Sequence, residues 1–221
     1  MRTAILVDGG FYRYRAQAIW GVKTPKERAN ELVSYCMRHI NSEKPHRELY
    51  RIFYYDCLPI SKKVYHPFLK TTQDLSKTDL YKWTIDFHNE LKKKRKLAIR
   101  LGRLSENTLT YNLKNDALKR ICNGRIQFED LTESDFSLSV EQKGVDMKIG
   151  LDISSLSYKK QVDQIVLISG DSDFVPAAKH ARREGIDFIL DPMWSPIKDD
   201  LYEHIDGLKS YAPNPKKAVL K

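Results

Sequence analysis

The chain of 221 residues has little of what several large classes of protein require. It has three cysteines, Cys36, Cys57 and Cys122, whose wide spacing and odd number argue against a disulfide framework and a zinc site. No apolar run approaches the roughly 20 residues that a membrane span needs. The first residues show no signal peptide, because Met1-Arg2 leads directly into an apolar run. We therefore expect a cytoplasmic protein with reduced thiols and no membrane partner.

Three common catalytic signatures are also missing. The sequence has no glycine loop ending in Gly-Lys-Ser or Gly-Lys-Thr, no Gly-x-Ser-x-Gly nucleophile elbow, and no His-plus-Cys set with zinc spacing. Positive charge, in contrast, is abundant: Lys and Arg number 38 against 29 Asp and Glu, a formal net charge of +9. This balance favours polyanionic partners, nucleic acid before membrane surfaces.

Apolar runs alternate with amphipathic, helical patterns along the chain. Such runs, typical of buried strands, lie at residues 3–7, 49–56, 97–104, 164–168 and 186–190. The alternation predicts an α/β fold with a mainly parallel central sheet flanked by helices on both faces. We expect a single domain over residues 1–211, with an insertion at about residues 105–140 and a basic, flexible tail at residues 212–221.

Acids follow two of the predicted strands. The stretch Ser169-Gly170-Asp171-Ser172-Asp173-Phe174 lies where a strand gives way to a helix, and the first strand ends in Asp8-Gly9-Gly10. In open α/β sheets this carboxyl edge is where ligands bind, and paired carboxylates suit a hard cation. Gly-Asp is also common in turns, and an Asp can cap a helix. The repetition of the arrangement favours a functional role.

A third acid, Asp146, opens a helix that follows Gly144, where a carboxylate is favoured even without a ligand. Asp152 lies six residues further on and off the face of Asp146, so we interpret it as a structural or supporting acid. Lys143 lies beside the predicted site and could neutralise a phosphate. Asp56 ends another predicted strand, where a simple turn explains it equally well.

Two further segments suit a nucleic acid. Aromatic and basic residues alternate directly after Asp8, and we expect Tyr12 and Arg13 to contact the substrate while other members face the core. The densest basic run, residues 92–96, includes Lys93 and Arg95. Three interpretations of this run stay open: a phosphate-binding patch, a solvated helix end and a localisation signal.

The acids at element boundaries are Asp8, Asp146, and Asp171 with Asp173. Carboxylates and waters suit Mg²⁺ or Mn²⁺, and such ions beside a basic surface make phosphodiester hydrolysis the natural reaction. Ser169 or Ser172 could orient a carboxylate or a water.

Three segments form a set: residues 5–11 (Ile-Leu-Val-Asp-Gly-Gly-Phe), 143–148 (Lys-Gly-Val-Asp-Met-Lys) and 168–176 (Ile-Ser-Gly-Asp-Ser-Asp-Phe-Val-Pro). Together they resemble the signature blocks of NYN-domain proteins of the PIN-like nuclease superfamily, and in particular its LabA-like branch. The resemblance implies a PIN-like fold and a metal-dependent endoribonuclease, in which the four acids hold Mg²⁺ or Mn²⁺ and metal-bound water attacks phosphorus. Where many relatives have Asn, this chain has Gly10.

The resemblance implies RNA as the partner, single-stranded or structured, and leaves DNA and an additional protein partner open. One alternative is an RNA-binding or regulatory module with a weak or vestigial nuclease site. Another is a phosphatase of the haloacid-dehalogenase type, in which a nucleophilic Asp-x-Asp should end the first strand. Here that strand ends in Asp8-Gly9-Gly10, which disfavours the phosphatase.

Overall fold

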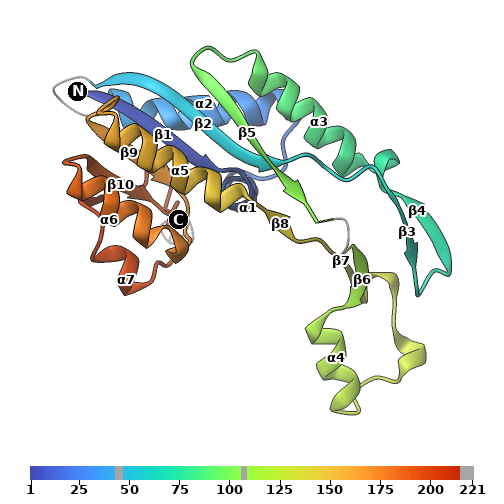
Figure 1. Cartoon of the computed structure of the whole chain (residues 1–221). Coiled ribbons are helices and arrows are strands. Elements are labelled where there is room, and N and C mark those ends of the chain that lie inside the picture. Colours follow the sequence, from blue (N-terminus) through green and yellow to red (C-terminus); the bar gives the residue numbers. More distant parts are fainter. Residues whose placement is uncertain (43–46, 106–108, 215–221) are drawn as a thin grey trace.

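The computed structural model describes residues 1–42, 47–105 and 109–214. Its centre is a seven-stranded sheet in the order β11-β10-β9-β1-β2-β5-β8 (Figure 1). Neighbouring strands pair in parallel, except that β8 runs antiparallel to β5. The mainly parallel sheet that the sequence predicts is therefore confirmed. The strands are β1 (Arg2–Asp8), β2 (Glu48–Cys57), β5 (Leu97–Leu104), β8 (Gln142–Lys143), β9 (Gln164–Ile168), β10 (Asp187–Asp191) and β11 (Gly207–Leu208).

Helices cover both faces of the sheet, as predicted. One face carries α1 (Gly9–Trp20), α2 (Pro25–Asn41) and α3 (Asp79–Lys92). The other carries α5 (Val145–Tyr158), α6 (Val175–Arg183) and α7 (Asp199–Tyr202). None of the helices in the described residues is long and apolar enough to cross a membrane.

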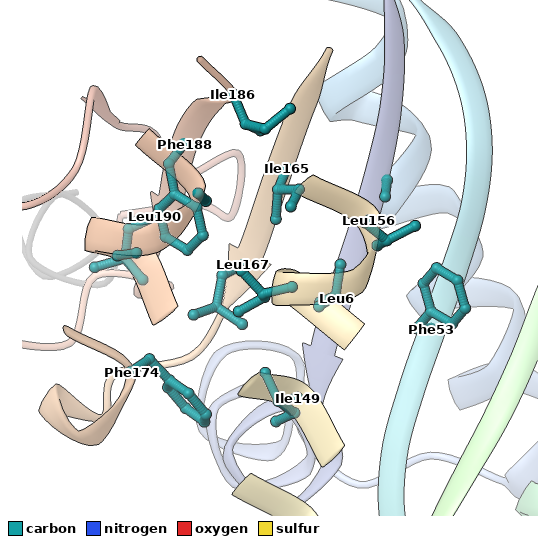
Figure 2. Close-up of a cluster of buried hydrophobic side chains, with 14 of the residues drawn as sticks. Leu6, Phe53, Ile149, Leu156, Ile165, Leu167, Phe174, Ile186, Phe188 and Leu190 are labelled. Carbon is teal, nitrogen blue, oxygen red and sulfur yellow. The ribbon is translucent and has the colours of Figure 1, made fainter. Parts of the chain in front are cut away.

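The central strand β1 contributes to a hydrophobic core on each face. Its side chains alternate, so that Ala4 and Leu6 join one core while Ile5 and Val7 join the other. Figure 2 shows the first of these cores, in which Leu6 and Leu167 lie beside Ile149 of α5. A strand buried on both faces requires a continuous apolar run, which explains the sequence of β1 and β9.

The connections reverse direction at the β1–β9 boundary. From β1 the chain crosses to β2 through α1 and α2 on one face, whereas β9 crosses to β10 through α6 on the other. In the sheet register, Val7 pairs with Ile168 and Asp8 with Tyr55. The residues that follow β1, β2 and β9 therefore meet at one edge, at the kind of switch point where open α/β sheets bind ligands.

Two insertions project from the sheet (Figure 1). One is the hairpin of β3 (Lys63–His66) and β4 (Thr71–Asp74), for which we had no expectation from the sequence. The other lies within the insertion predicted at about residues 105–140 and contains β6 (Thr110–Leu113), α4 (Asn115–Cys122) and β7 (Phe136–Ser139). They pack together, since the His66 ring centroid lies 4.1 Å from that of Tyr111. Of the predicted tail at 212–221, residues 215–221 lie outside the described residues.

The two glycines that begin α1 occupy very different surroundings. A Cβ on Gly9 would lie 2.5 Å from the Tyr55 carbonyl oxygen and 2.6 Å from Cζ of Tyr54, which is too close. A Cβ on Gly10 would lie no closer than 3.6 Å to its nearest neighbour, Oδ1 of Asp8. Gly9 therefore allows the close approach of α1 to β2, and Gly10 does not serve that purpose.

We expect Gly9→Ala to lower the free energy of unfolding by about 1–3 kcal/mol, because the added methyl group must displace backbone. Gly10→Ala should leave it unchanged or raise it by up to about 1 kcal/mol, because Ala favours the helix. Equilibrium urea unfolding of the two variants measures the difference. Equal effects would contradict the packing described for Gly9.

Candidate active site at the carboxyl edge of the sheet

Asp8 is fixed from two directions. It ends β1 and caps α1, with its Oδ1 accepting a hydrogen bond from the Phe11 amide at 3.1 Å. Its Oδ2 accepts one from Oγ of Ser169 at 3.4 Å. Ser169, the buried residue after β9, also accepts a hydrogen bond from the Asp171 amide at 3.3 Å. The first and last motifs of the sequence thus meet, through the serine that the sequence suggested as an orienting group.

The other three acids lie on the surface around this point. Asp146 lies in the first turn of α5, directly after Gly144 with its left-handed φ of +79°. Asp171 caps the short 3-10 turn at residues 172–174, and its Oδ1 accepts a hydrogen bond from the Asp173 amide at 3.0 Å. The capping role that we considered for the Gly-Asp motif is therefore present in the structure. The hydrogen bond of this cap uses one carboxylate oxygen of Asp171, Oδ1.

The acids influence one another electrostatically. Burial raises the pKa of the Asp8 carboxyl, and the charges of Asp146 and Asp171 raise it further, against the hydrogen bonds from Phe11 and Ser169. The pKa of Asp146 is raised by burial and then by the charges of Asp171 and Asp173. Mutual repulsion of this kind shows that negative charge accumulates at this edge.

The acids are a fitting donor set for a hard cation, since carboxylate oxygens are the ligands that Mg²⁺ and Mn²⁺ prefer. They do not form a compact ligand group, however. Across residues 1–42, 47–105 and 109–214, no three His, Cys, Asp or Glu side chains lie close enough together to hold a metal ion. The chemistry of the four acids therefore suits a divalent cation, while the arrangement in the structure is open.

A hollow of about 420 Å³ opens beside Asp8 and Asp171. Its walls include Phe11, Tyr14 and Arg15 of α1. The Phe11 ring rests on Gly170, where an added Cβ would lie 2.8 Å from Cε2 of the ring. The hollow combines acidic, aromatic and basic side chains. Its full lining is Asp8, Phe11, Tyr14, Arg15, Ser169, Gly170, Asp171 and Ser195.

The aromatic side chain of α1 that is accessible to a substrate lies two residues beyond the expected Tyr12. Tyr12 is fully buried, and its hydroxyl donates to Glu31 Oε1 at 3.2 Å, so its ring cannot stack on a base. Tyr14, in contrast, is 74% exposed, and it lines the hollow together with Arg15. Residues 11, 14 and 15 share one helix face, because side chains three and four positions apart are neighbours. That spacing was visible in the sequence.

Arg13 points to the end of β2. Its Nη1 forms an ion pair with the buried Asp56, whose Oδ2 also lies 2.9 Å from Nε2 of the buried His88. Burial alone would raise the pKa of Asp56, but the hydrogen bond from His88 and the charge of Arg13 outweigh it and lower the pKa. Asp56 is thus a compensated structural acid that orients Arg13, a function that the sequence did not reveal for it or for His88.

A second buried carboxylate supports the rim of the hollow. Asp191, at the end of β10, accepts hydrogen bonds from the Met193 amide at 2.8 Å and from Oγ of Ser210 at 2.7 Å, and it contacts Tyr35 and His39. The backbone that it holds is strained, since Met193 and its neighbour both have positive φ. The Met193 carbonyl oxygen in turn accepts a hydrogen bond from Nη2 of Arg15 at 2.7 Å.

The remaining predicted residues are dispersed. Lys143 is exposed on β8, with its Nζ 3.4 Å from Glu141 Oε2. Asp152 accepts hydrogen bonds from the Tyr55 hydroxyl at 2.8 Å and from Nε of Arg100 at 3.1 Å, as a structural acid does. Ser172 lies in the turn that Asp171 caps, and none of the described hydrogen bonds links it to an acid.

The basic run at residues 92–96 does not lie beside the acids. It precedes β5, which runs parallel to β2 and β1, so Lys93 and Arg95 lie at the amino edge of the sheet. In the sheet register, Leu97 at the start of β5 is level, through Ile52, with Ile5 of β1, about 10 Å before Asp8 along the strand direction and two strands away from it. The structure therefore does not bring Lys93 and Arg95 to the acids, and their binding of a phosphate stays a prediction.

The fold is that of an α/β protein with carboxylates gathered at the carboxyl edge of its sheet. The NYN domain family matches residues 2–196, and the chain belongs to this family. The NYN domain has a PIN-like nuclease fold, which implies a nucleic acid as the substrate. The LabA-like branch stays a prediction.

No match is found among the curated proteins. Among solved structures, a protein of unknown function from Vibrio parahaemolyticus aligns over 96% of this chain and 94% of that chain, with 15% identity and a TM-score of 0.48.

The raised pKa of Asp8 makes a prediction about stability and pH. The folded state binds this proton more tightly than the unfolded state. Protonation of Asp8 therefore stabilises the folded protein. This contribution is fully present below the pKa of Asp8 in the unfolded chain, about 4, and is lost as the pH rises through its pKa in the folded protein. We therefore expect Asp8→Asn, which keeps a capping acceptor but removes the charge, to raise the free energy of unfolding at neutral pH in chelator. Urea unfolding from acid to neutral pH should show this gain shrinking as the pH falls.

The same substitution at the exposed Asp86 of α3 is the control, and its effect should be small at every pH. An Asp8→Asn effect as flat as that of the control would show that burial and neighbouring acids do not destabilise ionised Asp8.

Proposed function

We propose that the protein is a metal-dependent endoribonuclease that hydrolyses RNA phosphodiester bonds at the acidic edge of its sheet. The observation that carries the proposal is that Asp8 and Asp171, which lie at the carboxyl ends of the adjacent strands β1 and β9, line one hollow and are linked through Ser169. The buried acids Asp56 and Asp191 are surrounded by donors, whereas the pKa values of Asp8 and Asp146 are raised. Carboxylates that destabilise one another at a ligand-binding edge are what a cation site requires.

The four acids would hold Mg²⁺ or Mn²⁺, because hard cations prefer carboxylate oxygens and water. When bound, such an ion lowers the pKa of a water molecule and stabilises the leaving oxygen, which suits an in-line attack on phosphorus. Ser169 and the Phe11 amide hold Asp8 in place for this role.

Two basic side chains would contact the phosphate. Arg15 shares the hollow with Asp8 and Asp171, and its guanidinium is fixed by the Met193 carbonyl oxygen. Lys143 is exposed on β8, directly before the turn that leads into Asp146. Both could neutralise phosphate charge as it develops in the transition state.

The second candidate is an RNA-binding or regulatory module with a weak or vestigial nuclease site. One observation favours it: within the described residues no three acids form a compact ligand group. Affinity for RNA without metal-dependent turnover would identify such a module.

Cleavage of end-labelled single-stranded RNA and DNA, with Mg²⁺, Mn²⁺ or EDTA, tests the proposal. We expect cutting of RNA that EDTA abolishes and that Asp146→Asn reduces by about 100-fold or more, equivalent to roughly 2.7 kcal/mol of transition-state stabilisation. Preferential cutting of DNA would correct the substrate class.

Asp86→Asn removes an exposed carboxylate of α3 and should cleave like the unaltered protein. Full activity in Asp146→Asn would refute the assignment of that residue. Retained RNA binding without cleavage by the unaltered protein would establish the binding module.

Metal binding has a readout that does not depend on turnover. Mn²⁺ at 100 times its dissociation constant should stabilise the folded protein by about 2.7 kcal/mol, since the unfolded chain lacks the site. Thermal unfolding with and without Mn²⁺ measures this effect, and Asp146→Asn should lose most of it. Equal stabilisation of both proteins would place the ion elsewhere.

A further inference from the structure

A second hollow, of about 440 Å³, adjoins the hollow beside Asp8 and Asp171. Tyr14 contributes to the lining of both. Gly10 lines the second hollow, and a Cβ at this position would lie 3.6 Å from Oδ1 of Asp8. The second hollow therefore begins within one side chain's reach of the Asp8 carboxylate.

The walls of the second hollow are apolar and unusually exposed. Tyr14 of α1, Val22 of the α1–α2 loop and Leu80 of α3 are 74%, 84% and 73% exposed. Trp83 lies behind them, held by the hydrogen bond from its Nε1 to the Lys23 carbonyl oxygen at 3.0 Å and by stacking on Phe87. Apolar side chains gathered at the surface in this way indicate a binding site.

Basic side chains border the same hollow, and acids behind them fix their positions. Lys23 and Arg28 both pair with Glu31, and Arg13 pairs with Asp56. Among the described residues, the hydrogen bonds of Arg13 are all made by its Nη1. Its Nε and Nη2 are thus available, at a wall of the hollow, to a phosphate group.

An occupant of this hollow must combine a flat apolar surface with negative charge next to it, and it must extend to the acids. A nucleotide of a single strand has these properties. Its base can stack on an aromatic ring, and its phosphate can meet a guanidinium. A base within a duplex is already stacked and paired, and it would have to be extracted first.

We infer that the second hollow is a nucleobase subsite, in which Tyr14 stacks on the base next to the phosphate held at the acids and Arg13 contacts the adjoining phosphate. The inference rests on the proposed function for the position of the phosphate. It makes single-stranded nucleic acid, or an unpaired segment of a folded one, the substrate class. The site is sequence-tolerant, because every base presents a π face.

Binding of a short, labelled, single-stranded RNA in EDTA tests the subsite without cleavage. We expect Tyr14→Ala to weaken binding by about 5- to 100-fold, the range for loss of one stacked base, and Tyr14→Phe to retain it. Tyr158→Ala is the matched control, since Tyr158 is equally exposed, at 74%, at the end of α5 and outside the lining of the hollow. A duplex of the same sequence should bind more weakly than the single strand and should be insensitive to Tyr14→Ala.

A series of oligonucleotides that each lack one base locates the contact. At one position, removal of the base should weaken binding to the unaltered protein as much as Tyr14→Ala does. The Tyr14→Ala variant should bind this abasic oligonucleotide as well as it binds the intact one. Equal weakening by Tyr14→Ala and Tyr158→Ala, or additive effects at every abasic position, would overturn the subsite. So would failure of the unaltered protein to bind any single strand.

The outcomes separate the subsite from the nuclease. If the protein cleaves with metal and Tyr14→Ala changes neither the rate of cleavage nor the affinity for RNA, the nuclease proposal is supported and the subsite is refuted. Tyr14-dependent binding without cleavage would keep the subsite and refute the nuclease. Binding of single-stranded DNA with the same dependence on Tyr14 would show that the subsite reads the base and not the sugar.

Discussion

The site depends on the way Asp8 joins a buried strand to a helix. β1 is buried on both faces and lies at the centre of the sheet, so its end is fixed in space. The Asp8 carboxylate accepts the Phe11 amide and thereby fixes where α1 begins. The rotation of the helix follows from its start, because each residue advances by the same angle. This places Tyr12 in the core and Tyr14 and Arg15 over the acids.

The carboxyl edge of the sheet carries two kinds of acid. Asp56 and Asp191 are buried, and the structure surrounds them with an arginine, histidines, hydroxyls or backbone amides. Both orient other groups, Arg13 in the first case and the loop that receives Arg15 in the second. The second kind, Asp8 with Asp146, has raised pKa values and repels its neighbours. Neighbouring donors compensate the charge of the first kind, whereas a bound cation or proton would compensate the charge of the second.

Most of the architecture was predictable from local patterns. Strands such as β1 and β9 are continuous apolar runs, and their parallel arrangement brings Asp8, Ser169 and Asp171 together without further information. Tyr12 faces the core although it alternates with basic residues, because a helix places positions three and four apart, such as Phe11, Tyr14 and Arg15, on one face. Lys93 and Arg95 lie away from the acids because their run precedes a strand that is parallel to β2 and β1, whereas the acids follow their strands. The partners of Asp56 come from α1 and α3, and only tertiary packing brings them together.

Gly10 lines the second hollow and lies beside Asp8, which lines the first. The resemblance to other NYN domains would place an Asn here, and its side chain would project from the start of α1 toward Asp8 and the second hollow. Gly10 leaves this passage open, and Gln142 of β8 brings a side-chain amide to it, with Nε2 3.9 Å from the position of an added Cβ. β8 in turn approaches because Gly102 of β5 has no side chain, where a Cβ would lie 2.8 Å from the Lys143 carbonyl oxygen. A side-chain amide from β8 can therefore approach the position beside Asp8 that the Asn of other NYN domains would occupy from α1.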